Sequence, residues 1–549
     1  MSASEDLAQL AHDYWEALLE RNPTLATFFG DYRYNDRLPD AGPEGRAAEE
    51  SALRDVLARL RSIDQAQLAT DERVTWDMLR LAAEQVLAAL PFRLDEMAVD
   101  QMGGPQVWLP ELLNWHPLDT PEHIQQLVAR YQGFGRYMDQ YLENLRDGVR
   151  DGRTAAHMAT ERVVGQLRVL LDTPPVDSVL YSPAKEAPAQ AEELLGALER
   201  SVYPAYQRML DYLQGEYLNE HARQEPGVWS VADGAAIYNI LCQQHTTTDL
   251  TPDELHRIGL EELEGIQREM RAIMAGQGDS SGNIRAFTER LTRDPANLPS
   301  TREEIVETAK RLLDQAQAAL PRAFGKMPSI PCEVKAIEEY REKDSVAAFY
   351  YPPAGDGSRP GIFYVNTYDP PSRPRHTMPA LTFHEAVPGH HLQIALATET
   401  KDLPEFRRLG SDVTAYVEGW ALYTERLADE LGLYPDERAR YGMLGYQAWR
   451  ACRLVVDTGL HHLRWSRQQG IDFFLQNVGL TERETVNEVD RYIIWPGQAL
   501  SYKIGQREIE SLRREASGVD LRAFHDEVLA HGAVPLSTLR ATIKMSFRA

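Results

Sequence analysis

Apolar residues recur at intervals of three and four positions through most of this chain, and that period indicates amphipathic helix. Between Asp6 and Glu20 the stripe consists of Leu7, Leu10, Ala11, Tyr14, Trp15 and Leu18. Similar stripes occur at about 45–63, 71–89, 121–149 and 189–217. At Thr251 to Glu254 the order Thr-Pro-Asp-Glu is typical of a helix start, with Thr as N-cap and Glu at the third position. The pattern predicts a mainly α-helical fold.

One region departs from this period. Three short segments, at 331–339, 346–351 and 361–367, are rich in β-branched and aromatic residues and predict a small antiparallel sheet. Helical patterns return after the sheet. We therefore expect two lobes, a helical N-terminal lobe over 1–325 and a catalytic lobe over 326–549.

The composition excludes several classes of protein. The chain has 549 residues and a formal net charge of −25, whereas binding to nucleic acid or to anionic membranes needs clustered Lys and Arg. The first residues lack a basic segment followed by an apolar run, and no later run is long and apolar enough to span a membrane. The three cysteines lie far apart and match no disulfide or zinc-ribbon spacing. These features predict a cytoplasmic protein with no nucleic-acid partner and no membrane partner, and they give no oligomeric state.

The segment from His384 to His391 reads His-Glu-Ala-Val-Pro-Gly-His-His and indicates a metal site. In zinc peptidases of the His-Glu-x-x-His type, two histidines one helical turn apart bind the metal. On a regular helix His391 would lie about 10 Å along the axis from His384, too far to share one zinc ion. Pro388 and Gly389 must therefore break or bulge the helix. A two-residue bulge makes His390 the second ligand, and a three-residue bulge makes it His391.

Two further residues complete the predicted zinc site. Glu385 follows the first histidine and is placed to act as general base on the water that the metal activates. The segment Ser411 to Leu431 predicts a helix on which Glu418 is surrounded by apolar residues, which favours it as the third ligand. Glu425, two turns further on, is the competing carboxylate, although a salt bridge with an arginine would also explain it.

A third predicted helix, Tyr441 to Trp465, carries one polar stripe made of Arg450, Arg453, Asp457 and His461. The stripe predicts either a structural ladder of ion pairs or a catalytic role. In the catalytic interpretation, His461 or an arginine stabilises the oxyanion or binds a substrate carboxylate. Tyr492 and Tyr502 are candidates for a hydroxyl that polarises the scissile carbonyl, and a packed core tyrosine is the alternative for either.

Several long motifs resemble the bacterial family known as domain of unknown function 885. They are HEAVPGHHLQ, EGWALYTE, VDTGLH, PGQALSYKIG and, nearer the N-terminus, NPTLATFFGDYRYNDRLPD and HTTTDLTPDELHRIGL. The chain is more distantly similar to the carboxypeptidase Taq and thimet oligopeptidase families, which pair a His-Glu-x-x-His helix with a Glu on the next helix. This resemblance implies a zincin-like metallopeptidase with a deep cleft, a small sheet beside the metal helix, and His384, Glu385, His390 and Glu418 in the site. The two-residue insertion at Pro388-Gly389 departs from the shorter motif.

We therefore expect a zinc-dependent peptidase that cleaves short peptides. Zinc would be held by His384, His390 or His391, and Glu418, while Tyr502, His461 or both would stabilise the oxyanion. The strand ending near Asn366 would pair with an extended substrate as an edge strand. The alternatives are a zinc amidase acting on a modified amino acid or small metabolite, and a non-catalytic binding protein on the same scaffold.

Overall fold

The computed structural model describes residues 2–339, 342–355, 357, 359–410, 413–478 and 481–547, and its contacts divide the chain into two compact units. The first unit spans 1–237 and the second spans 238–549. Helices α11 to α13, which precede residue 326, make their contacts in the second unit, with α18, α14 and the sheet. None of the helices in the described ranges combines the length and the apolar composition that a bilayer span requires.

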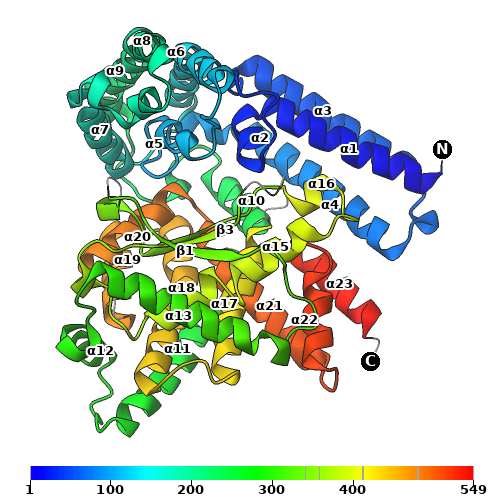
Figure 1. The fold of residues 1–549 in the computed structure, drawn as a ribbon, viewed down its shortest axis with the longest axis vertical. Coiled ribbons are helices and arrows are strands. Elements are labelled where there is room, and N and C mark those ends of the chain that lie inside the picture. The colour runs from blue at the N-terminus through cyan, green and yellow to red at the C-terminus, as the bar shows by residue number, and fades with distance from the viewer. Residues whose placement is uncertain are drawn as a thin grey trace. The chain divides into compact units, whose positions relative to one another are not determined.

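The first unit is helical, as the three- and four-residue period predicts (Figure 1). Its core gathers around the long helix α6, with fully buried Leu127, Tyr131 and Phe134. The predicted segment at 189–217 consists of two α-helices separated and followed by π-helical turns. The helices of this unit are α1 (Ala3–Arg21), α2 (Pro23–Phe29), α3 (Pro43–Ser62), α4 (Thr70–Ala89), α5 (Pro105–Glu111), α6 (Pro121–Asp151), α7 (His157–Asp172), α8 (Ala191–Ala197) and α9 (Tyr203–Tyr212), and α10 (Gly234–Thr246) spans the division.

The second unit combines helices with the sheet. The Thr251 start is confirmed, because its side chain accepts from the Glu254 backbone and the Glu254 carboxylate accepts from the Thr251 backbone. Helices α11 and α18 pack along each other, and so do α17 and α21. The helices are α11 (Pro252–Gly276), α12 (Ile284–Arg293), α13 (Arg302–Ala319), α14 (Met378–Glu385), α15 (His390–Glu399), α16 (Glu405–Arg408), α17 (Thr414–Glu430), α18 (Glu437–His461), α19 (Arg467–Asn477), α20 (Glu482–Ile494), α21 (Ser501–Glu515), α22 (Leu521–Leu529) and α23 (Leu536–Ser546).

The sheet is mixed and not antiparallel throughout, which corrects the prediction. Its strands β1 (Cys332–Ala336), β2 (Ala348–Tyr351) and β3 (Gly361–Val365) lie in the order β1-β3-β2. β2 and β3 pair antiparallel across a short connection, but β1 pairs parallel to β3. The strand before Asn366 is thus central and not an edge strand, so it has no free side for a substrate. Helix α13 packs against β1 and β3, and α14 packs against β2, which brings the sheet beside the helix that carries His384.

Helices α17 and α21 approach so closely that each presents a glycine to the other. A Cβ on Gly419 would lie 2.4 Å from the Cα of Gly505, and a Cβ on Gly505 would lie 1.7 Å from the carbonyl oxygen of Ala415. Both contacts are with backbone, which cannot swing aside as a side chain can. This packing fixes the position of Glu418, the residue before Gly419, along the axis of α17 relative to α21.

Replacing Gly505 by alanine should therefore lower the stability of the protein. We expect the Gly505→Ala variant to lose about 1–3 kcal/mol, the range for overpacking a tight core, and to show a lower midpoint of thermal unfolding by circular dichroism. Gly445→Ala on α18 is the matched control, because its Cβ would meet no atom within 4 Å. That variant should unfold at the wild-type temperature or slightly above it, since alanine favours helix. Equal midpoints for the two variants would contradict the argument.

Candidate metal centre

Three of the predicted ligands converge in the second unit. His384 lies in the last turn of α14, His390 begins α15, and Glu418 lies in the second turn of α17. One ligand atom from each of the three lies within 4.8 Å of the others. The Oε2 atom of Glu418 is 3.5 Å from Nε2 of His384 and 3.6 Å from Nε2 of His390. The three elements thus direct a carboxylate and two imidazoles at one point.

The helix breaks between Glu385 and His390, as the Pro388-Gly389 pair predicts. Gly389 lies so close to the end of α14 that a Cβ there would be 1.9 Å from the carbonyl oxygen of His384. The indole Nε1 of Trp420 on α17 donates a hydrogen bond of 2.9 Å to the carbonyl of Pro388. The chain therefore turns back before α15 begins, and the rings of His384 and His390 lie 4.9 Å apart at 87°.

The distances between the ligand atoms fit a metal ion in tetrahedral coordination. Two atoms bonded to one zinc ion at about 2.1 Å lie about 3.4 Å apart in tetrahedral geometry, close to the two Glu418–histidine separations. Those separations are too long for hydrogen bonds, which join nitrogen and oxygen at about 2.7–3.2 Å. Oε2 of Glu418 is buried and has no hydrogen-bond partner among the described residues. A buried carboxylate oxygen facing two imidazole nitrogens in this way suits Zn²⁺ by donor type and by spacing.

Glu425, the competing carboxylate, contacts the other side of His384. Nδ1 of His384 donates to Oε1 of Glu425 over 3.0 Å, and Nε2 of Gln447 donates to Oε2 over 3.0 Å. With its proton on Nδ1, His384 presents the lone pair of Nε2 toward Glu418, the tautomer that a metal requires. Glu425 is fully buried and therefore positions the histidine instead of joining the three converging atoms.

The charges around His384 also favour a bound cation. Burial opposes a positive imidazole, yet the carboxylates of Glu418 and Glu425 on its two sides raise the pKa of His384 to about 9. The two imidazoles in turn hold the pKa of Glu418 well below its ordinary value despite its burial. The site thus stabilises positive charge between the rings and the Glu418 carboxylate, and a metal ion would supply that charge in place of the histidine proton.

The neighbours of the ligands occupy two different environments. Glu385 is the last residue of α14, is half-buried, and acts electrostatically on His384. His391, the alternative ligand, faces away from this point: Nε2 donates to the carbonyl of Ile330 over 3.0 Å and Nδ1 accepts from the hydroxyl of Tyr350 over 2.9 Å. Burial lowers the pKa of His391 to about 4, so it is neutral and ties α15 to β2.

The other predicted catalytic residues, Tyr502 and His461, lie apart from each other. Tyr502 lies under the guanidinium of Arg453, 4.3 Å from its centre, and its hydroxyl accepts a hydrogen bond of 3.1 Å from Arg491. His461 follows Arg453 by two turns, about 12 Å along the axis, and donates from Nε2 to the carbonyl of Tyr492 over 2.9 Å. The structure therefore places Tyr502 near the arginines and His461 at the far end of the helix.

The sequence analysis missed three residues that take part in the polar contacts around the site. Gln447 bonds to Glu425, and Nζ of the buried Lys503 donates to Gln447 over 2.9 Å. Glu488 on α20 is the carboxylate partner of Arg453 at 3.0 Å. Gln447 could have been found, because it precedes Arg450 by three positions and so extends the polar stripe of α18. Lys503 and Glu488 lie on other helices, and no local spacing relates them to the stripe.

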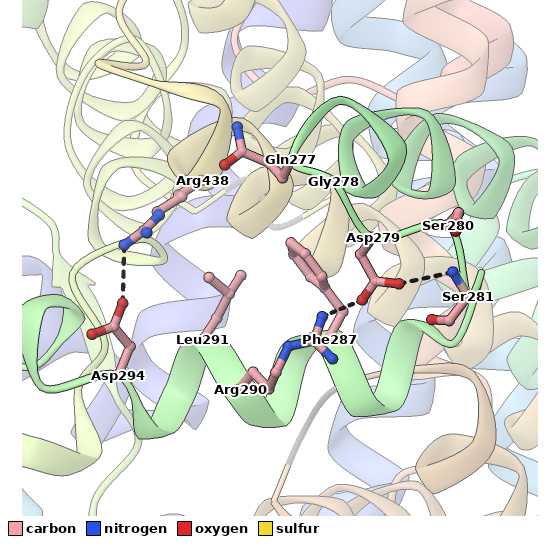
Figure 2. Close-up of a pocket in the computed structure, with 10 residues that line it drawn as sticks. All are labelled: Gln277, Gly278, Asp279, Ser280, Ser281, Phe287, Arg290, Leu291, Asp294 and Arg438. Atoms are coloured by element: carbon pink, nitrogen blue, oxygen red, sulfur yellow. Dashed lines mark hydrogen bonds and ion pairs between the residues drawn. The ribbon is translucent and has the colours of Figure 1, made fainter.

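Among the described residues, a separate pocket of about 580 Å³ lies between the end of α11 and α12, away from this centre (Figure 2). Its charged side chains are already paired: Arg290 with Asp279, and Arg438 with Asp294 at 3.1 Å. Histidine and cysteine do not line it. The pocket therefore offers no donor set like that of the metal centre.

Fold and site together define a mostly helical protein in which ligand atoms of two histidines and a glutamate lie within 4.8 Å of one another. The chain belongs to the family described as bacterial protein of unknown function (DUF885), whose model matches residues 23–543. The predicted membership is thus confirmed, whereas similarity to the zinc peptidases stays a prediction. No curated protein matches the chain.

Two solved structures share the fold. A crystal structure from Colwellia psychrerythraea has a TM-score of 0.95, is 28 % identical, and the match covers 100 % of both chains. One from Shewanella oneidensis has a TM-score of 0.76 and 19 % identity over 97 % of this chain and 99 % of that chain. Both are described as a "putative lipoprotein". This description contradicts the predicted cytoplasmic location, which rested on the absence of a recognisable export signal.

Asp457, in the polar stripe of α18, generates a prediction about pH. Its carboxyl is fully buried and accepts from the Tyr238 hydroxyl over 2.7 Å and from the backbone of Gly497 over 3.1 Å. Burial raises the pKa of Asp457 from 3.8 to about 7. The folded state therefore binds this proton more tightly than the unfolded chain, and its contribution to stability is lost as the pH rises from about 4 to about 7.

We expect Asp457→Asn to reduce that dependence, because an amide has no proton to lose. Unfolding midpoints in urea measured from pH 4 to pH 8 should decline less steeply for the variant than for the wild type, each pKa unit being worth about 1.4 kcal/mol. The exposed Asp472→Asn on α19 is the control and should follow the wild-type curve. Parallel curves for wild type and Asp457→Asn would refute the assignment.

Proposed function

We propose that this protein is a zinc-dependent hydrolase whose substrates are short peptides. The observation that carries the proposal is the buried Oε2 of Glu418, which has no hydrogen-bond partner within the described part of the chain and lies 3.5–3.6 Å from two imidazole nitrogens. Three protein ligands of this kind, two histidines and a glutamate, are the set found in catalytic zinc sites that leave a fourth position open.

We assign the roles of the site residues as follows. His384, His390 and Glu418 would hold Zn²⁺, which supplies Lewis-acid chemistry by polarising a carbonyl and making water nucleophilic at neutral pH. Glu425 keeps His384 in the tautomer that presents Nε2. The carboxylate of Glu385, adjacent to His384, accepts the proton of the attacking water and passes it to the leaving nitrogen.

A hydroxyl is available to stabilise the oxyanion. Tyr502 accepts from Arg491, and its own proton has no acceptor among the described residues. The hydroxyl of Tyr492, by contrast, donates to Glu488 over 2.6 Å. We therefore assign the donor role to Tyr502 and not to Tyr492. His461 bonds to a backbone carbonyl at the far end of α18, and we assign it a structural role.

The sheet gives limited support for peptides as substrates. β2 pairs with β3 on one side, packs against α14, and carries Tyr350, whose hydroxyl bonds to His391 beside the second ligand. If an extended substrate pairs with a strand here, β2 is the strand that lies next to the metal helices. The description of the Colwellia protein as a lipoprotein supports a site of action outside the cytoplasm, at a membrane surface.

The choice of second histidine is testable by metal content. Purified wild-type protein should contain about one zinc per chain by mass spectrometry of the metal, and His390→Gln should contain far less, because tetrahedral zinc sites need their protein ligands. His391→Gln, at the adjacent residue, is the matched control. It should keep zinc, since His391 bonds to Tyr350 and Ile330 instead. Loss of zinc from His391→Gln with retention in His390→Gln would reverse the assignment.

The role of Glu385 is testable by hydrolysis. A library of short peptides should be cleaved by the zinc-loaded wild type, and Glu385→Gln should lower kcat by at least about 100-fold because the general base is lost. Zinc content should not change in this variant, which separates the loss of a base from the loss of the metal. Hydrolysis of small amides without any peptide cleavage would favour an amidase, and wild-type rates in Glu385→Gln would exclude the mechanism.

A further inference from the structure

Three arginines, two of them buried and one half-buried, lie near the metal centre. Arg450 and Arg453 come from α18 and Arg491 from α20, and their side chains are 7 %, 3 % and 15 % exposed. We call these three residues the arginine cluster. Aromatic rings enclose them, with Trp449 lying 4.8 Å from Arg450 and 4.9 Å from Arg453. A guanidinium held between rings in this way is desolvated, and its polar interactions are correspondingly strong.

Carboxylates of the described residues do not balance this charge. Glu488 is shared, at 3.0 Å from Arg453 and 3.8 Å from Arg491. The nearest carboxylate to Arg450 is Glu425, at 4.0 Å, and Glu425 already accepts from His384. One positive charge is therefore left over from the pair Arg453 and Arg491 with Glu488. A buried ionic group is stable when it is paired, so the cluster needs one further anion.

Several N–H groups of the cluster have no acceptor. Nη1 of Arg453, Nε and Nη1 of Arg450, and Nε of Arg491 are buried and without a hydrogen-bond partner among the described residues. Buried donors without a partner are uncommon and each costs about 1–3 kcal/mol, more for charged groups. Four of them in one cluster indicate a ligand that supplies acceptor oxygens.

The cluster reaches the metal ligands through one intervening carboxylate, Glu425. Burial opposes the charge of Arg453, but Glu488, the hydroxyls of Tyr492 and Tyr502, and Glu418 raise the pKa of Arg453 well above its ordinary value. Arg450 reaches Glu425, whose other contact is His384. Tyr502, stacked under Arg453, has a hydroxyl proton without an acceptor among the described residues. An anion bound to the cluster would therefore lie near Tyr502, the residue that we assign to the oxyanion.

We propose that the arginine cluster binds a substrate carboxylate, and that the substrates are peptides cleaved next to their free carboxy-terminus. This inference rests on the proposed hydrolase function and deepens it. A carboxylate carries the single negative charge that the cluster lacks, and its two oxygens match the planar fork of a guanidinium. A peptide bond in the middle of a long peptide has no free main-chain carboxylate near it that could bind the cluster. The protein is thus a carboxypeptidase and not an endopeptidase.

The test compares three ligands: one carries a terminal carboxylate, one carries no carboxylate, and one carries a side-chain carboxylate instead. Binding of acetyl-Ala-Phe free acid, its carboxamide, and acetyl-Ala-Asp carboxamide is measured by calorimetry on zinc-loaded Glu385→Gln protein, in which turnover is suppressed. We expect the free acid to bind at least tenfold more tightly than both amides. Tight binding of the Asp amide alone would assign the cluster to a side-chain carboxylate and overturn carboxy-terminal cleavage. Equal binding of all three, or no binding, would overturn the proposal, while zinc content judges the metal centre separately.

Variants of the cluster give a second readout. Arg453→Lys keeps a positive charge beside Glu488 but loses the guanidinium fork, so the acid-to-amide preference should fall at least tenfold with zinc content unchanged. Arg440→Lys, on the same helix and paired with Asp429 at 2.9 Å, is the control and should keep the preference. An unchanged preference in Arg453→Lys would refute the role of Arg453. Should that variant unfold, the ligand comparison in the Glu385→Gln protein decides alone.

Discussion

The contact of Gly389 with the end of α14 is the constraint on which the site depends. Only a residue without a Cβ can approach the His384 carbonyl this closely, and this approach interrupts the helix between Glu385 and His390. His390 thereby lies beside His384, whereas a continuous helix would carry it about 9 Å along the axis. Trp420 fixes the same turn from α17 through its bond to Pro388, so the helix that carries Glu418 is held against the loop that precedes His390.

The third ligand is placed by backbone packing as much as by polar contacts. Gly419 and Gly505 let α17 and α21 meet almost backbone to backbone, so α17 has little freedom to slide. Glu418 and Glu425, on that rigid helix, then contact opposite sides of His384. One carboxylate faces the point where the ligands converge, and the other orients the ring. Precision in both contacts is what a metal site requires of its scaffold.

Local periodicity predicted much of this fold, and tertiary contacts decided the rest. The helices near 6–20, 45–63 and 121–149, the cap at Thr251, and the break at Pro388-Gly389 depend on residues within a few positions of each other. The parallel pairing of β1 with β3 does not depend on such local spacing, because the period of a strand does not specify its partner. His390 and His391 are neighbours in sequence, and only the return of the chain separates the one facing Glu418 from the one bonded to Ile330.

The remaining argument concerns charge. Acidic groups surround the histidines, with Glu385, Glu418 and Glu425 near His384, while α18 and α20 bring arginines to the adjoining space. Left alone, each set is costly, because a buried carboxylate oxygen and several buried N–H groups lack partners among the described residues. The unpartnered groups carry opposite charges: the carboxylate needs a cation and the arginines need an anion. The metal ion and the carboxylate-bearing substrate that we propose would satisfy both sets at once, and a fold tolerates such incomplete pairing where it serves binding.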